Sequence, residues 1–407
     1  MKNYIFYLEP YTYSNTTMDE ILLINTLDGS SIYRNDSPEI VKIINTLKQQ
    51  SELYVTFINE EEFGKNSVHD FITEVRLKFM GDIYLFDKQT AIKPIQFIPQ
   101  IKDMLPRAGH KSINSLMHLR CINLYINNLV DCDESDYFHY KPNKQFKWIL
   151  TGNKYISLNI EQIHKVLKML SKGNAKLNLL GGNIFDHENI DEITSIINKY
   201  NILANYYVHY KNLLSIDKNL IKQISSKKIV VMVDFDDTSY LYETFNGFEN
   251  ACSFQYQFIV KSDDELELTD KFVEDFEITN YIIRPYYDGN NISFFNNNVF
   301  LDRSMILSNK ISLREIYANS ITNTLNYGDI TIMPDKNVYA NLNHNVLGNI
   351  EYEELSHIIC KEITTGNSWK LTRNNVDICK NCVMRDICSP ISNYELVMER
   401  FNLCNIR

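Results

Sequence analysis

Strand-like and helix-like segments alternate between residues 116 and 330, and this rhythm constrains the fold more than any other feature of the sequence. Parallel strands need a crossover connection, usually a helix, and that crossover is right-handed. We therefore predict an α/β unit built on a mainly parallel sheet or barrel, with any chemistry at the ends of its strands. The expected strands span residues 121–127, 176–180, 202–208, 229–235, 254–260 and 281–285.

The clearest helix of this region begins at Asn159. Gln162 follows three residues later, which is the spacing of a capping box. Apolar residues then recur at the spacing of one helical face, and they are Ile160, Ile163, Leu167 and Leu170.

Residues 1–110 predict a small α+β domain. Asp28–Gly29 predicts a hairpin turn, Ser37–Pro38 predicts the start of one helix, and Ser67 is expected to cap another. The second helix is expected to bury Val68, Phe71, Ile72, Val75 and Phe79. The expected strands span residues 4–8, 21–24, 31–33 and 53–58.

Residues 331–407 contain a short hairpin signal, a helix near residues 352–363 and a cluster of cysteines. Asn and Pro residues over 93–115 indicate a linker or irregular connection. Three domains are therefore expected, at residues 1–110, 116–330 and 331–407.

Charge and composition exclude several classes of partner. The 41 Lys and Arg against 51 Asp and Glu give a net charge of −10, without the basic block that proteins following a phosphate backbone need. Nucleic acid is therefore not an expected partner. The first ten residues lack the pattern of a secretory signal, and no apolar run approaches the ~20 residues that cross a bilayer. We expect a cytoplasmic protein with no membrane partner.

Four of the eight cysteines follow the pattern Cys379-x2-Cys382-x5-Cys388, with Cys404 fifteen residues further on. In a reducing compartment such a cluster indicates metal ligands before disulfides. Four soft sulfur ligands suit either Zn²⁺ or an iron–sulfur cluster, and the spacing does not choose between them. The remaining interpretation is four ordinary buried thiols.

The segment from Asp335 to Asn341, the Leu347–Ile350 segment, the following helix and the cysteine set together resemble a SPASM domain, the auxiliary-cluster extension of many peptide-modifying radical SAM enzymes. The resemblance implies one auxiliary [4Fe–4S] cluster at Cys379, Cys382, Cys388 and Cys404. Two other cysteines of that family are replaced here, one near Ala340–Asn341 and one at Ser392. The resemblance therefore implies one cluster and not two.

The middle region resembles the radical SAM partial barrel. Its first strand would be residues 123–127, and Gly181, Gly182 and Asn183 stand where that family has Gly-Gly-Glu. The family's Cys-x3-Cys-x2-Cys loop corresponds to Cys132, Asp136 and His139, so two of three thiolates are missing. The resemblance thus implies a degenerate barrel that does not bind S-adenosylmethionine. An ordinary acidic loop, or a different metal, also fits these three residues, and Gly181–Gly182 fits either a ligand contact or a tight turn.

The combination resembles the pseudo-radical-SAM/SPASM proteins of the GG-Bacteroidales peptide-maturation system, which acts on ribosomally synthesised and post-translationally modified peptides (RiPPs). The N-terminal region resembles a winged-helix leader-peptide recognition domain, whose hairpin edge accepts a peptide as an added strand. The resemblance implies a non-catalytic scaffold, a pseudoenzyme that binds a precursor peptide, an active radical SAM enzyme, or both. A plain accessory domain remains the other interpretation of residues 1–110.

An enzymatic alternative comes from residues 230–238. Asp234 ends a predicted strand and Asp236 follows two residues later, as in the phosphotransfer loop of haloacid-dehalogenase-type enzymes. The sequence lacks the usual Gly after the second Asp and an evident later Lys with an acidic partner, so a strand followed by a solvated acidic turn is favoured. A redox enzyme that uses the auxiliary cluster for electron transfer, and a structural zinc protein, also remain open.

Overall fold

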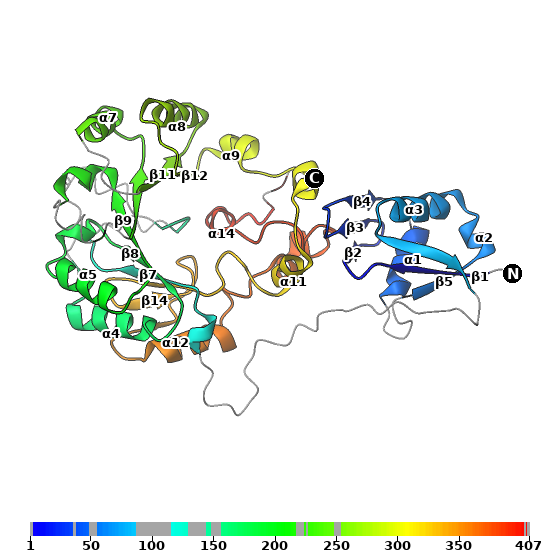
Figure 1. Cartoon of the computed structure of the whole chain (residues 1–407), viewed down its shortest axis with the longest axis horizontal. Helices are drawn as coiled ribbons and strands as arrows, with labels where there is room; N and C mark the ends of the chain where they lie inside the picture. Colours follow the sequence, from blue (N-terminus) through cyan, green and yellow to red (C-terminus); the bar gives the residue numbers. More distant parts are fainter. Residues whose placement is uncertain are drawn as a thin grey trace.

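The computed structural model describes residues 3–35, 38–48, 55–86, 115–128, 144–147, 156–216, 224, 227–247, 254–402 and 404. An N-terminal unit lies at one end of the molecule and a larger α/β unit at the other (Figure 1). The C-terminal part of the chain, which includes α14 (Asn393–Met398), lies between them.

The N-terminal unit contains two antiparallel sheets, with strand orders β5-β1-β6 and β2-β3-β4. Their apolar faces and helices α1 (Pro38–Leu47) and α3 (Asn66–Leu77) share one core, in which Phe6, Ile44 and Phe71 are buried. A short helix, α2 (Glu60–Phe63), precedes α3. The strands are β1 (Asn3–Leu8), β2 (Thr12–Thr16), β3 (Ile21–Asn25), β4 (Ser31–Arg34), β5 (Val55–Asn59) and β6 (Gly81–Leu85).

The expected strands of this unit and the helix starting at Pro38 are confirmed, and Ser37 lies outside the described residues. Two expectations about the next helix are wrong. Ser67 lies inside α3, whose N-cap is Lys65. Phe79 lies beyond the end of α3, has a φ of 53° and is 74% exposed. The helix ends at Leu77, so Phe79 does not share the buried helical face of Phe71 and Val75. Strands β2 and β6 were not expected.

The larger unit is built on one nine-stranded sheet, with strand order β12-β11-β10-β9-β8-β7-β13-β14-β15. Strands β7 to β12 pair in parallel with their neighbours in sequence, which confirms the predicted parallel α/β architecture. β13 also pairs in parallel with β7 and crosses the expected boundary near residue 330, whereas β14 and β15 are antiparallel. The bounds are β7 (Cys121–Tyr125), β8 (Lys176–Leu180), β9 (Ala204–His209), β10 (Lys228–Val233), β11 (Phe254–Val260), β12 (Tyr281–Pro285), β13 (Asp329–Ile332), β14 (Asn337–Tyr339) and β15 (Gly348–Asn349).

Helices cover the outer face of this sheet (Figure 1). The capping box that predicts α4 is present: Asn159 Oδ1 accepts from the Gln162 amide over 2.9 Å, and Gln162 Oε1 accepts from the Asn159 amide over 3.2 Å. No helix in the described part of the chain combines the length and apolar composition that crossing a bilayer requires. The remaining helices are α4 (Ile160–Leu170), α5 (Ile190–Lys199), α7 (Thr238–Gly247), α8 (Asp263–Asp275), α9 (Ile292–Asn298), α10 (Arg303–Ser308), α11 (Leu313–Ile321), α12 (Leu355–Thr364) and α13 (Asp377–Lys380).

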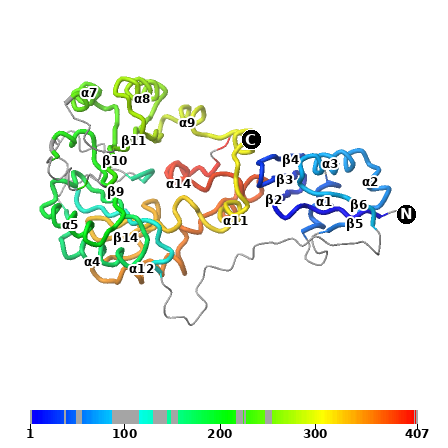
Figure 2. The backbone as a smooth tube through the Cα atoms, viewed as in Figure 1, coloured from blue at the N-terminus to red at the C-terminus, as the bar shows by residue number. Residues whose placement is uncertain are grey.

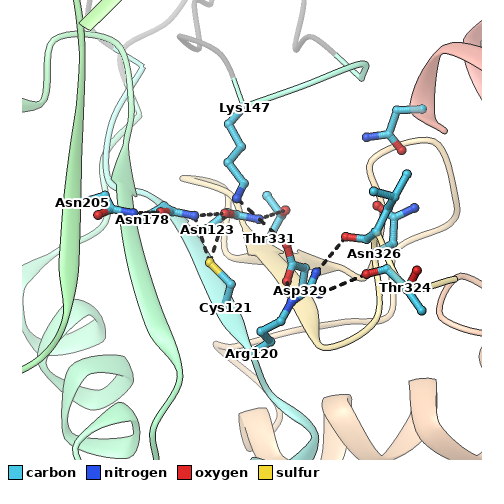
Figure 3. Close-up of polar contacts among 12 residues, drawn as sticks. Arg120, Cys121, Asn123, Lys147, Asn178, Asn205, Thr324, Asn326, Asp329 and Thr331 are labelled. Atoms are coloured by element: carbon cyan, nitrogen blue, oxygen red, sulfur yellow. Dashed lines mark hydrogen bonds and ion pairs between the residues drawn. The ribbon is translucent and has the colours of Figure 1, made fainter. Parts of the chain in front are cut away.

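The inner face of the sheet carries a row of side-chain amides that runs across four strands (Figure 3). Asn205 on β9 donates to Asn178 on β8 over 2.9 Å, and Asn178 donates to Asn123 on β7 over 2.7 Å. Asn123 then donates to the hydroxyl of Thr331 on β13 over 3.4 Å. Each strand contributes at the same level because the register pairs Asn178 with both Asn123 and Asn205. This row, which we call the amide row, fixes the register of the sheet.

We predict that Asn178→Leu lowers the free energy of unfolding. Leucine has nearly the same volume, but it removes the partner of the Asn205 side-chain amide and leaves the Asn123 side-chain oxygen with only the weak Cys121 thiol contact at 3.7 Å, and a buried unpaired group costs about 1–3 kcal/mol. Urea denaturation followed by circular dichroism measures the change. The matched control is Asn198→Leu on the exposed face of α5, which we expect to shift the midpoint little; equal midpoints for the two variants would contradict the role of the amide row.

Candidate functional site

A polar cavity of about 300 Å³ lies between the inner face of the sheet and the C-terminal part of the chain. The sheet contributes side chains from five strands, beginning with the Asn123 end of the amide row. Residues 144–147 and 325–326 and the C-terminal segments complete the wall. The sheet residues are Asn123, Tyr125, Tyr207, Gln257, Arg284, Asp329 and Thr331, and the C-terminal residues are Ala340, Asn341, Leu342, Ser392, Asn393 and Tyr394.

The two positions that the sequence analysis singled out, near Ala340–Asn341 and at Ser392, both line this cavity. Asn341 donates to the Asn393 side chain over 2.8 Å, although 52 residues separate them. Ser392 caps α14, because its hydroxyl accepts from the Glu395 amide over 3.3 Å. Only the fold shows that both positions adjoin the same wall.

Asp329 is the acidic residue of the cavity wall. It pairs with Arg120 Nε over 3.2 Å and with Lys147 Nζ over 4.0 Å (Figure 3). Burial raises the pKa of Asp329, and the two cations oppose that rise. The Arg120 guanidinium also donates to the carbonyls of Thr324 and Leu325 over 3.0 and 2.8 Å. These bonds tie the chain before β13 to the start of β7.

The four clustered cysteines lie in one neighbourhood of the C-terminal part. Cys379 is in α13, Cys382 and Cys388 follow it, and Cys404 forms a β-bridge with Leu301. Burial raises the pKa of Cys379, Cys382 and Cys388, the last to about 11, and the charge of Cys404 adds to the rise in all three. Without a bound cation these three thiols are therefore protonated at neutral pH.

A buried arginine adjoins this cysteine cluster. Arg373 donates to both carboxylate oxygens of Glu395 over 2.9 and 3.2 Å, and its Nη1 also lies 3.7 Å from the Cys379 sulfur. It donates further to the carbonyls of Ser389 and Phe401 over 2.6 and 3.0 Å. Burial would lower the pKa of Arg373, but Cys388 and Glu395 raise it above its usual value. A permanent cation here favours thiolates over thiols.

Four thiolates would be soft ligands for a metal group, and Cys379, Cys382, Cys388 and Cys404 are the cysteines that could supply them. Among the described residues, no set of three or more His, Cys, Asp or Glu side chains is gathered for metal coordination. The group at these cysteines is accordingly argued as a proposal below.

The N-terminal sheet β2-β3-β4 packs directly on the cysteine loop (Figure 2). The Tyr13 hydroxyl donates to Asp386 over 2.8 Å, and the Asn15 amide donates to the Val383 carbonyl over 2.7 Å. Arg385 donates back to Asn15 over 3.3 Å. Both units bury apolar side chains in this contact, which are Tyr13, Leu22, Ile24, Ile306, Ile311, Ile316, Val383, Met384 and Ile387. Residues 383–387 are thus held from both sides.

The Gly181–Gly182–Asn183 segment forms a tight turn against Asn127. A Cβ atom at Gly181 would lie 2.2 Å from Asn127 Oδ1, so this position requires glycine. The Gly182 amide donates to Asn127 Oδ1 over 3.0 Å, and the Asn127 amide donates to the Asn183 carbonyl over 2.8 Å. The Asn183 side chain, buried to 1% exposure, bonds within its own turn to Phe185 and Asp186. Cys132, Asp136 and His139 lie outside the described residues.

A second polar cluster lies at the carboxyl ends of β9, β10 and β11. Asp234 is 2% exposed; its Oδ2 lies 3.0 Å from His209 Nε2, and its Oδ1 accepts weakly from the Asp236 amide over 3.4 Å. Burial by itself would raise the pKa of Asp234, but His209 and nearby lysines lower it below its usual value. Lys261, at the end of β11, pairs with Asp236 over 2.7 Å.

This cluster corrects the sequence interpretation at one position and weakens the phosphotransfer alternative. The turn is not uniformly solvated, because Asp234 is buried. Lys261 does pair with Asp236, a partner that sequence inspection missed. However, both carboxylate oxygens of Asp234 are engaged by its neighbours, so it does not present a free oxygen for attack on phosphorus.

Several residues of these sites were not found from the sequence. Asn123, Asn178 and Asn205 each interrupt an apolar strand, and asparagine is depleted in strands, so their recurrence in three neighbouring strands was an available signal. His209 and Lys261 directly end or follow predicted strands, which is where polar residues meet in a parallel sheet.

A scan against protein-family models and a search of curated proteins gave no match. Similar solved structures include Streptococcus suis SuiB bound to S-adenosylmethionine, at 10% identity and a TM-score of 0.46 over 98% of this chain and 100% of that chain. SuiB bound to precursor peptide SuiA has 12% identity and a TM-score of 0.45 over 100% of both chains. BtrN in complex with AdoMet and 2-DOIA has 13% identity and a TM-score of 0.34 over 65% of this chain and 92% of that chain. Similarity this distant carries no argument about function.

We predict that Asp234→Asn lowers the free energy of unfolding at pH 7 by about 1–3 kcal/mol, the cost of a disrupted buried bond to His209. The folded-state pKa of Asp234 is below its unfolded value, so its stabilisation is present above about pH 4 and is lost as the pH falls through the folded pKa. The variant should therefore show a shallower acid limb in unfolding measured from pH 7 to pH 2. Asp191→Asn, at an exposed site on α5, is the control; an acid limb equally steep in Asp234→Asn and wild type would contradict the assignment.

Proposed function

We propose that this chain is a non-catalytic, peptide-binding scaffold for the maturation of a ribosomally made peptide, and that it works beside an active radical SAM enzyme. The observation that carries the proposal is the composition of the cavity wall. By the resemblance to SPASM domains, cysteines would be expected near Ala340–Asn341 and at Ser392, and these residues line the cavity without a thiol. The cysteine set that includes Cys379 is kept in the same C-terminal part of the chain.

The replaced positions favour binding over redox chemistry. Amide and hydroxyl groups are poor ligands for iron–sulfur centres, and Asn341 is already bonded to Asn393. In the Cys132 loop the same resemblance finds one thiol in place of three. The cavity wall therefore carries amide and hydroxyl groups, among them Asn341, Ser392 and Asn393, in place of thiols. Such groups can hydrogen-bond to a peptide but do not ligate an electron-transfer cluster.

The N-terminal unit supports a peptide-binding role through the open edge of β4. Among the described strands β4 pairs with β3 alone. The Asn25 amide donates to the Ser30 carbonyl, so the alternation of an antiparallel ladder turns the N–H and C=O groups of Ser31 outward. The Lys78 ammonium donates to the outward Ser31 carbonyl over 2.8 Å, so an added strand would displace this contact and pair with the Ser31 N–H. A peptide added here would extend the sheet, as in a winged-helix leader-recognition domain.

We predict that Ser31→Pro weakens peptide binding by roughly three- to tenfold, the value of one hydrogen bond, because proline removes the outward-facing N–H. The probe is the tightest binder selected from a random dodecapeptide library on the whole chain, measured by fluorescence anisotropy. Ser31→Ala keeps the N–H and should bind as the wild type does. Equal affinity for all three proteins would contradict strand addition at β4. The non-catalytic role has a separate test: release of 5′-deoxyadenosine from S-adenosylmethionine by the isolated, reconstituted protein would overturn it.

The four cysteines would hold one [4Fe–4S] cluster, with Zn²⁺ as the alternative. Either group would tie α13, the loop that contacts the N-terminal sheet, and the segment at Cys404 to one point. Its role in this proposal is structural, since thiolate ligation then offsets the cost of burying the thiols.

We expect anaerobically purified protein to contain ~4 iron and ~4 sulfide per chain, as a four-cysteine cluster requires. Cys379→Ser should lose the iron and the visible absorption. Cys360→Ser is the matched control, because Cys360 is a free thiol on α12 outside the cluster. Zinc without iron would contradict the cluster, and full iron content in Cys379→Ser would contradict the ligand assignment.

A further inference from the structure

The Arg284 guanidinium lines the cavity, and no carboxylate among the described residues pairs with it. It lies on β12 and pairs in register with Ile259, on the face of the sheet that lines the cavity. Its charge acts on the hydroxyl groups of Tyr207 and Tyr394, which face the same space. Yet its Nε is buried without a hydrogen-bond partner, and the described residues offer it no ion pair.

The other arginines near the cavity are satisfied, which makes Arg284 distinct. Arg120 has a carboxylate and two carbonyls, and Arg373 has Glu395 and two carbonyls. Burying polar nitrogen without a partner is costly, and native structures seldom do so unless a ligand completes the site. The Nε atom itself is enclosed, so the part of Arg284 left for a ligand is the end of its guanidinium, which lines the cavity and has no ion pair among the described residues.

The charges around the cavity favour an anion. Lys144, Lys147 and Arg284 line it with one carboxylate, Asp329, which pairs with both Arg120 and Lys147. This excess of positive charge stands out in a chain whose net charge is −10. Lys144 is exposed and marks the mouth, whereas Arg284 lies further in on the sheet.

We propose that Arg284 binds a carboxylate of the peptide that this scaffold holds, either an Asp or Glu side chain or a C-terminal carboxylate. A guanidinium can donate two parallel hydrogen bonds to one carboxylate, and the two terminal nitrogens of Arg284 are the pair that could do so from the cavity wall. Gln257 and Asn123 supply amides for the adjoining peptide groups. A cavity of about 300 Å³ holds one residue or a short terminus and not a folded segment. The inference rests on the proposed peptide-binding function and names the chemistry that the cavity selects.

The test compares acids with their amide isosteres by titration calorimetry on the full chain. The α-amide of N-acetylglutamate against the α-amide of N-acetylglutamine probes a side-chain carboxylate, and acetyl-Gly-Gly against its C-terminal amide probes a terminal one. We expect one acid to bind about tenfold more tightly than its amide, and Arg284→Gln to remove that preference. Arg314→Gln, at an exposed position on α11, should leave it unchanged. Equal binding of both acids and their amides, or a preference that survives Arg284→Gln, would overturn the inference.

Thermal unfolding gives a second, independent readout. If the role of Arg284 is to bind a ligand, Arg284→Gln should leave the Tm of the ligand-free protein unchanged or raise it, because the cation that is removed has no ion pair among the described residues. A lower Tm or failure to fold would show that the guanidinium already has a structural partner, and would overturn the inference. The two proposals can fail separately. If Ser31→Pro does not change dodecapeptide binding but Arg284 still gives a preference for acid over amide, the strand-addition proposal fails and this inference stands. If Ser31→Pro weakens dodecapeptide binding but no acid preference depends on Arg284, only this inference fails.

Discussion

The buried ion pair between Arg373 and Glu395 is the interaction on which the C-terminal part of the molecule depends. Both side chains are nearly inaccessible, at 7% and 0% exposure, and the guanidinium also takes the carbonyls of Ser389 and Phe401. Removing one partner would strand a buried charge, at a cost of about 3–5 kcal/mol. Because Glu395 belongs to α14 and Arg373 contacts Cys379, the same pair positions both the cavity wall and the cysteine cluster.

The sheet supplies the opposite wall, and its two faces differ in chemistry. The outer face packs apolar side chains under the helices, as a parallel sheet normally does on both sides. The inner face instead carries the amide row, where Asn123, Asn178 and Asn205 satisfy one another. A buried polar row is tolerated only when its members are paired. The same face also carries a buried apolar cluster that includes Tyr125, Tyr207 and Ile259, so the amide row is a polar line within a mixed surface.

The N-terminal unit is coupled to this arrangement through the cysteine loop. Tyr13 and Asn15 on β2 bond to Asp386 and Val383, between Cys382 and Cys388. The opposite edge of the same sheet, β4, is the open one. A peptide bound to β4 and a group bound at the cysteines would thus lie at opposite edges of the β2-β3-β4 sheet. The cavity that Arg284 lines is also lined by Asn393 and Tyr394 of α14.

The sequence by itself determined the local elements. The capping box at Asn159 and the alternation of strands and helices fixed the parallel α/β architecture, because caps and periodicity act over about one turn or one strand. The same reasoning failed at Phe79, where the chain turns back before the apolar period is completed. The cysteine cluster was also visible, because its spacing is local. Tertiary structure alone decided that Asn341 meets Asn393, that His209 meets Asp234, and that Arg284 meets no carboxylate among the described residues. Those contacts depend on which segments, far apart in the sequence, are packed against one another in the fold. The spacing of residues within one helix or strand carries no information about that packing.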